Sequence, residues 1–211
     1  PWRLAFALQR DDWFLRQDII WAKGNPMPES VKDRCTKSHE YIFLLTKRPR
    51  YYFDYKAIAE KSIYFDIDKR ARHGRVPHKS GKSASEDSQY AINGVCFSDD
   101  GLKNKRSVWN INTKPSSVAH FAVFPEKIPE LCIKAGSRVG DTVLDPFFGS
   151  GTTGYVAQRL DRKWIGIELN PEYIKIAEQR FRQQELFAPH GSEMETITYH
   201  DPGDENDKRN N

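Results

Sequence analysis

Two acidic residues flank a glycine-rich stretch in the last third of the chain. Asp145 ends one apolar run, a glycine motif at Gly149, Gly151 and Gly154 follows, and Glu168 ends the next apolar run. This order predicts a strand, a glycine turn that opens a helix, and a second strand that ends on an acid. The spacing matches a fingerprint in which the glycines face phosphates and the acid binds ribose hydroxyls, so it indicates a cofactor that contains adenosine.

The residues beside the turn argue against a nicotinamide dinucleotide. A pyrophosphate would lie over the turn and the helix N-terminus. Asp145 would repel it there by about 4 kcal/mol at roughly 4 Å and an effective dielectric of about 20. Phe147 and Phe148 are also bulky where the backbone should approach the ligand closely. S-adenosylmethionine is the better candidate, because its sulfonium and ammonium groups would be attracted by Asp145 while Glu168 binds its ribose. A nicotinamide oxidoreductase is kept as an alternative.

Composition narrows the class of protein further. The 211 residues carry a net charge of +4 and are 38% hydrophobic, which allows one domain with an insertion. No apolar run approaches the roughly 20 residues of a membrane span, and no signal peptide is present, so we expect a cytoplasmic protein. The three cysteines are far apart, and none has metal-ligand spacing, so we expect no metal site. The sequence leaves the oligomeric state open.

Strands and helices alternate through most of the chain, which predicts an α/β fold. An antiparallel hairpin at a sheet edge is expected from the two N-terminal apolar runs. The predicted strands are 18–21, 40–46, 108–111, 141–145 and 164–168. The predicted helices are 1–9, 125–135, 152–160 and one that begins at Pro171.

Several separated segments resemble the DNA amino-methyltransferases, which methylate cytosine N4 or adenine N6. Residues 145–153 (DPFFGSGTT) and 166–173 (GIELNPEY) resemble the cofactor motifs of that family. Residues 107–111 with 120–125, and residues 18–30 with 39–45, resemble its other segments in the order of the permuted beta class. The resemblance implies an S-adenosylmethionine-dependent, Rossmann-like methyltransferase sheet, here incomplete, with an inserted DNA-recognition region.

The resemblance also implies domain boundaries and a partner. Double-stranded DNA is the expected partner. The implied parts are 1–49 on the target-base side, 50–115 as the target-recognition insertion, 116–185 on the cofactor side, and 186–211 as a polar tail that we expect to be disordered.

Roles follow from the resemblance residue by residue. The methionine side of the cofactor would be contacted by Asp145, Phe147, Gly149, Gly151 and Thr152, with Glu168 on the ribose. The pocket would be lined by His120, Ala122 and Phe124. The target base or DNA would be approached by Trp21, Lys23 and Asn25, and DNA phosphates by Arg70, Arg72, Arg75, Lys79 and Lys82.

The family's catalytic tetrapeptide, Asp or Ser followed by Pro-Pro-Tyr, does not occur in these residues. The chain begins at Pro1 as though inside an amphipathic helix, so we expect a fragment whose catalytic motif lies upstream of Pro1. We expect a site-specific DNA methyltransferase acting on an exocyclic amino group of a flipped base. The block at 25–30 resembles members that act on cytosine N4, which favours that target. Adenine N6 is the alternative, and a DNA-binding fragment without catalytic activity is another.

Overall fold

The computed structural model describes residues 1–61, 91–92, 95–96, 102–113 and 124–187. The chain divides into two compact units. One unit comprises Pro1–Phe53 and Ser107–Asn211, and the other comprises Asp54–Arg106. Within the described residues, no helix has the length and apolar character needed to cross a bilayer.

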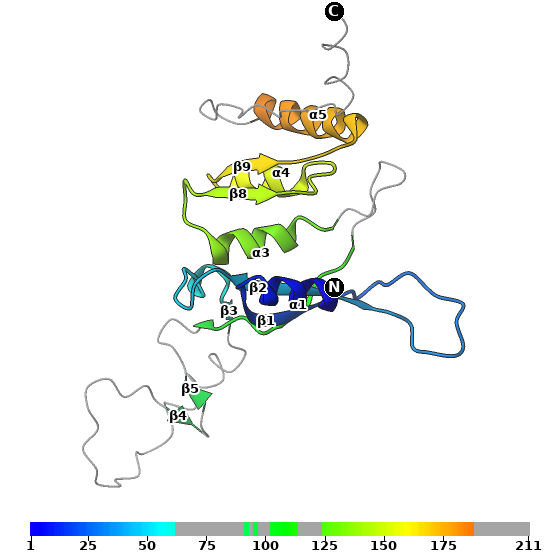
Figure 1. The fold of residues 1–211 in the computed structure, drawn as a ribbon, viewed down its shortest axis with the longest axis vertical. Coiled ribbons are helices and arrows are strands. Elements are labelled where there is room, and N and C mark those ends of the chain that lie inside the picture. Colours follow the sequence, from blue (N-terminus) through cyan, green and yellow to red (C-terminus); the bar gives the residue numbers. More distant parts are fainter. Residues whose placement is uncertain (62–90, 93–94, 97–101, 114–123, 188–211) are drawn as a thin grey trace, which may run out of the picture. The chain divides into compact units, whose positions relative to one another are not determined.

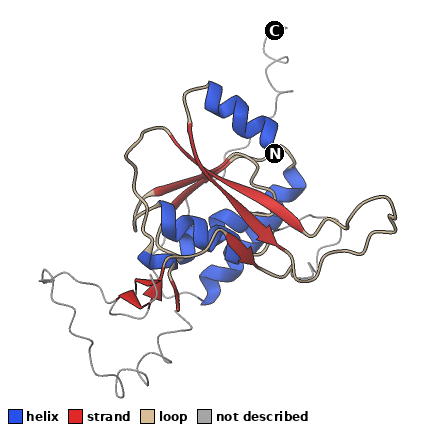
Figure 2. Cartoon of the chain, turned by 90° about the horizontal axis from the view of Figure 1, so that it is seen from below, coloured by secondary structure: helices blue, strands red, loops and turns tan. Residues whose placement is uncertain are grey.

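The N-terminal part of the first unit is a three-stranded sheet with the order β2-β1-β7. Its strands are β1 (Phe14–Ala22), β2 (His39–Thr46) and β7 (Val108–Asn110). β1 and β2 form the predicted antiparallel hairpin, and the loop that joins them extends away from both strands (Figure 2). The hairpin lies at the edge of the sheet as predicted: β2 is the edge strand, and β7 pairs in parallel with the other side of β1.

Helix α1 (Trp2–Arg10) packs on this sheet through aromatic side chains. The ring of Trp2 lies 5.6 Å from that of Tyr41 and 4.9 Å from that of Phe43. Tyr41 and Phe43 are two apart on β2, so both side chains lie on the same face of the sheet. α1 covers that face near the residues that begin β2.

The C-terminal part of the first unit contains the strand–helix–strand element predicted around the glycines. β8 (Thr142–Asp145) and β9 (Lys163–Gly166) are parallel, and α4 (Thr152–Arg159) connects them (Figure 1). α3 (Lys127–Gly136) precedes β8, and α5 (Pro171–Phe187) follows β9. β9 ends two residues earlier than predicted, so Glu168 lies just beyond the strand.

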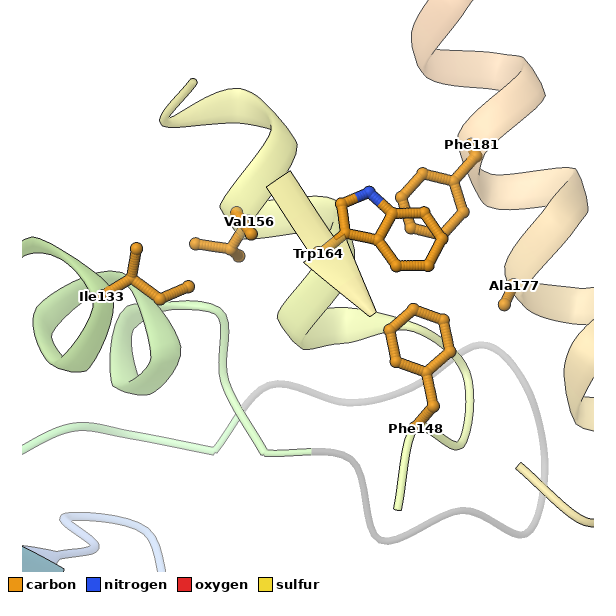
Figure 3. Close-up of a cluster of buried hydrophobic side chains, with 7 residues drawn as sticks. Ile133, Phe148, Val156, Trp164, Ala177 and Phe181 are labelled. Atoms are coloured by element: carbon orange, nitrogen blue, oxygen red, sulfur yellow. The ribbon is translucent and has the colours of Figure 1, made fainter. Parts of the chain in front are cut away.

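An aromatic stack forms the core of this element (Figure 3). The Trp164 ring stacks on Phe148 at 5.0 Å and on Phe181 at 4.7 Å between centroids. Val156 and Ala177 are fully buried beside it. The core therefore joins one face of the β8–β9 pair to α4 and α5, and it lies directly beneath the glycine turn.

The second unit has short elements: η1 (Lys56–Ile58), β3 (Glu60–Lys61), β4 (Ala91–Ile92), β5 (Val95–Cys96) and β6 (Leu102–Lys103). β3 pairs with β6, and β4 pairs with β5, both antiparallel. Glu60 accepts hydrogen bonds from Lys105 and Arg106, each at 3.1 Å. Burial raises the pKa of Glu60, but these two cations outweigh it, so the pKa lies below its ordinary value.

Candidate cofactor site

Asp145 and Glu168 come from neighbouring strand ends. Asp145 is the last residue of β8, and it lies opposite Gly166, the last residue of β9. The chains remain paired beyond the strands, because the Ile167 N–H donates to the Asp145 carbonyl and the Phe148 N–H donates to the Ile167 carbonyl, both at 2.9 Å. The two acids therefore lie at the same edge of the parallel pair, where such sheets bind ligands.

The glycines of the turn meet different requirements. Gly149 (φ +53°) and Gly151 (φ +76°) both have left-handed backbone conformations, which favour glycine. A Cβ on Gly149 would meet nothing closer than 4.0 Å, so its backbone is open to a ligand. A Cβ on Gly151 would lie 3.0 Å from Ala177 and 3.1 Å from Phe181. Gly151 is thus required by the core beneath the turn as well as by its backbone conformation.

Glu168 holds the turn from the side. Its Oε2 accepts a hydrogen bond from the Gly149 N–H at 2.7 Å, and its Oε1 accepts one from the Asn170 N–H at 2.8 Å. A carboxylate can accept about four hydrogen bonds, so both oxygens can also accept hydroxyl donors. Glu168 combines a structural bond to the glycine turn with the acceptor capacity expected for a ribose diol.

The two phenylalanines after Asp145 have opposite environments. Phe147 is 88% exposed, and its N–H donates to Asp145 Oδ1 at 3.0 Å. Phe148 is only 4% exposed and belongs to the core. The prediction that both rings obstruct the approach of a ligand is therefore wrong for Phe148, whose ring points beneath the turn. Space for the ring exists because Gly154 and Gly166 have no side chain: a Cβ would lie 2.6 Å from it at Gly154 and 2.4 Å at Gly166.

Thr152, expected on the methionine side, is 4% exposed. Its Oγ1 accepts a hydrogen bond from Arg180 Nη1 of α5 at 3.0 Å. Phe124 is partly exposed and lines, with Val143 and Thr153, a largely apolar pocket of about 430 Å³. His120 and Ala122 lie outside the described residues.

The residues expected near the target base gather where β1 meets its loop. Trp21 is 5% exposed, and its Nε1–H donates to the Ile111 carbonyl at 2.7 Å. Lys23 forms an ion pair with Glu40, and its ammonium lies 4.6 Å from the centre of the Trp21 ring. Trp21 is thus packed, whereas Lys23 is held beside it at the surface of the sheet.

Asn25 ties the same loop to a distant part of the chain. Its Nδ2 donates to the Thr113 carbonyl at 3.1 Å, and its Oδ1 accepts from the Thr113 N–H at 2.9 Å. Nothing in the local sequence of either residue predicts this pair, because the partners are 88 positions apart. A pocket of about 250 Å³ is lined here by Lys23, Asn25, Pro26, Met27, Glu29, Lys37, His39, Glu40 and Thr113.

The basic residues expected on DNA phosphates, Arg70, Arg72, Arg75, Lys79 and Lys82, lie outside the described residues. In the described part of the chain, no group of three or more His, Cys, Asp or Glu side chains could hold a metal ion.

Comparison with known proteins gives one consistent family. The profile of the DNA methylase family, the N6/N4 methyltransferases, matches residues 2–179. The Type II methyltransferase M.SmaI of Serratia marcescens is 51% identical over 180 residues, which are 85% of this chain and 50% of that protein. M.Cfr9I of Citrobacter freundii is 48% identical over 185 residues, 88% of this chain and 50% of its own length. The chain therefore spans about half the length of these relatives.

Solved structures agree on the fold. The PvuII DNA methyltransferase, described as cytosine-N4-specific, matches with a TM-score of 0.57 at 22% identity over 84% of this chain and 55% of that protein. M1.HpyAVI in complex with S-adenosylmethionine matches with a TM-score of 0.51 at 23% identity over 84% of this chain and 67% of that chain. These matches show that the chain has the methyltransferase type of α/β fold. The chain belongs to the DNA methylase family of N6/N4 methyltransferases. This assignment leaves the nicotinamide oxidoreductase without support.

Proposed function

We propose that the glycine turn binds S-adenosylmethionine. The observation that carries the proposal is the placement of Asp145 and Glu168 at adjoining strand ends, with the open backbone of Gly149 next to Glu168. Asp145 would face the cationic methionine part, and Glu168 would accept the ribose hydroxyls. The exposed Phe147 and the partly exposed Phe124 would cover apolar parts of the ligand. Family membership supports the same assignment.

Calorimetric titration with S-adenosylhomocysteine and with NAD tests this site. We expect binding of the first compound only. Glu168→Ala should weaken it by roughly 10- to 100-fold, because hydrogen bonds to a carboxylate contribute about 1.5–3 kcal/mol. Glu172→Ala is the matched control, since it removes an exposed acid from the first turn of α5. Binding of NAD in place of S-adenosylhomocysteine would refute the cofactor assignment.

The proposed reaction is transfer of a methyl group to an exocyclic amino group of a DNA base, with cytosine N4 as the target. When bound, S-adenosylmethionine supplies the methyl group on its sulfonium. The base must leave the duplex to reach the site, and the chain's contribution is alignment of the two reactants. Lys23, Asn25 and the loop around them would lie on the DNA side, with the buried Trp21 supporting them. The Pro-Pro-Tyr tetrapeptide is absent from these 211 residues. We therefore propose that residues outside this sequence bind and orient the amino group.

We further propose double-stranded DNA as the partner and the cytoplasm as the location. The setting would be a restriction–modification system, in which methylation protects the host's own sites. The relatives that carry this argument are named Type II methyltransferases. Adenine N6 is the second candidate target.

Mass spectrometry of nucleosides identifies the target. The protein as its gene encodes it would be incubated with S-adenosylmethionine and unmethylated DNA, and the DNA digested. N4-methylcytosine is the expected product. N6-methyladenine would favour the second candidate. DNA binding without either product would instead support a DNA-binding protein without catalytic activity.

A further inference from the structure

Three charged residues join α3, α4 and α5 behind the glycine turn. Glu126 lies directly before α3. Its Oε1 accepts a hydrogen bond from Arg180 Nη2 at 2.8 Å, and its Oε2 accepts one from Arg159 Nη1 at 3.0 Å. Arg159 ends α4, and Arg180 belongs to α5. One carboxylate therefore binds a guanidinium on each oxygen and holds the two other helices to the start of α3.

Arg180 makes two further contacts, both with α4. Its Nη1 donates to Thr152 Oγ1 at 3.0 Å, and its guanidinium lies 4.4 Å from the centre of the Tyr155 ring. A planar guanidinium can donate to two acceptors while it stacks on a ring, and a lysine ammonium cannot reproduce this. The Arg180 side chain is 26% exposed, so these contacts are largely shielded from solvent.

The partners of Arg180 adjoin two parts of the proposed cofactor site. Thr152 is the first residue of α4 and follows Gly151 of the glycine turn directly. Glu126 is two positions beyond Phe124, which lines the pocket beside Thr153. Arg180 is therefore hydrogen-bonded both to the residue that follows the glycine turn and to the segment that contains Phe124.

We propose that Arg180 is a positioning residue for the cofactor site: through Thr152 and Glu126 it fixes the glycine turn against the segment that ends at Phe124. This inference rests on the proposed function and assigns Thr152 a new role. In this role the buried hydroxyl of Thr152 accepts the hydrogen bond from Arg180 and does not contact the ligand.

The buried hydroxyl distinguishes this role from that of an ordinary surface ion pair. Exposed ion pairs are screened by solvent and contribute little. The bond from Arg180 to Thr152 is directional, charge-assisted and shielded, since Thr152 is only 4% exposed. Its removal without loss of volume should therefore loosen the turn while the core remains packed.

The test uses isosteric variants of the purified chain. Thr152→Val removes the hydroxyl at equal volume, Thr152→Ser keeps it, and Arg180→Met removes the donor. Arg182→Met is the matched control, because it removes an exposed positive charge from the same helix. Amide hydrogen exchange of the peptide covering 146–155 is measured without ligand, and the Kd for S-adenosylhomocysteine is measured by calorimetry.

We expect Thr152→Val and Arg180→Met to accelerate exchange in that peptide and to raise the Kd about 10-fold, the effect of losing one charge-assisted hydrogen bond. Thr152→Ser keeps the hydroxyl and should therefore give slower exchange and a lower Kd than Thr152→Val. Arg182→Met should match the unsubstituted chain. Exchange and Kd that stay unchanged in Thr152→Val and Arg180→Met would overturn the positioning role alone. Failure of the unsubstituted chain to bind S-adenosylhomocysteine would overturn the proposed cofactor site as well.

Discussion

At the scale of single residues, the ring of Phe148 occupies space that two distant glycines leave empty. A Cβ on Gly166 would lie 2.4 Å from Cγ of Phe148, well inside normal contact distance. Gly166→Ala should therefore overpack the core and lower the free energy of unfolding by about 1–3 kcal/mol. Urea denaturation followed by tryptophan fluorescence measures the change, because Trp164 belongs to the same stack.

Gly136→Ala is the matched control for this prediction. A Cβ at Gly136, the last residue of α3, would meet nothing within 4 Å, and this glycine has no positive φ. Alanine there should be neutral, or stabilising by up to about 1 kcal/mol through the unfolded state. Equal stability of the two variants would mean that Phe148 does not fill the space beside Gly166.

The sequence predicts individual residues well where one local pattern determines the position. Asp145 ends β8, as the strand–turn–helix pattern predicts, and Glu168 lies two residues beyond the end of the paired strand β9. The directions of Phe148 and Thr152 were not predictable in this way. Phe148 was expected to obstruct the ligand because its side chain is large. Its ring is buried instead, in space that is free because Gly154 and Gly166, on other elements, have no side chain. Thr152 depends similarly on Arg180, 28 positions away.

At the scale of elements, α3 carries an ionisable group that makes its stability depend on pH. Glu130 accepts hydrogen bonds from Lys134 Nζ at 2.7 Å and from Lys127 Nζ at 3.1 Å. Burial raises the pKa of Glu130, but the two lysines outweigh burial, so its pKa lies below its ordinary value. The ionised form is therefore favoured in the folded protein.

A lowered carboxyl pKa stabilises the folded protein above the unfolded-state pKa, about 4.3, and this stability is lost as the pH falls through the folded pKa. Glu130→Gln should lower the free energy of unfolding by about 0.5–1 kcal/mol at neutral pH, the sum of two helical pairs. The deficit should vanish in strong acid. Denaturation at a series of pH values measures it. In a background with Lys127→Met and Lys134→Met the deficit should be small throughout, and a deficit independent of pH would exclude the ion pairs as its cause.

The positions of the strands were predicted better than the pairing between them. The strands around residues 18–21, 40–46, 108–111 and 141–145 occur, although β1 begins earlier, at Phe14. The parallel pairing of β7 with β1, and the Asn25–Thr113 bonds beside it, join segments separated by a whole compact unit. Hydrophobic periodicity describes one element at a time and contains no information about such pairing.

At the scale of the whole molecule, the chain divides into an α/β unit and a second unit of short strands. The predicted insertion at 50–115 encloses the second unit, Asp54–Arg106. The basic residues expected on DNA phosphates, Arg70, Arg72, Arg75, Lys79 and Lys82, lie outside the described residues. Length and composition indicated one domain with an insertion, and the alternation of predicted strands and helices indicated the α/β class. Binding of DNA by the insertion is a proposal, and it is tested in solution.

Salt dependence provides that test. Each phosphate neutralised by a cation contributes about 0.9 to the slope of log K against log salt concentration for duplex DNA. If Arg70 and Arg72 contact phosphates, replacing both with Gln should weaken DNA binding and make the slope shallower by up to about 2. Replacement of Lys208 and Arg209 with Gln is the control, because it removes the same charge from the polar tail and should leave the slope unchanged. Fluorescence anisotropy with a labelled duplex at several salt concentrations measures both variants. If the two slopes equal that of the unsubstituted protein, the basic segment of the insertion is a solvated surface and DNA is held elsewhere.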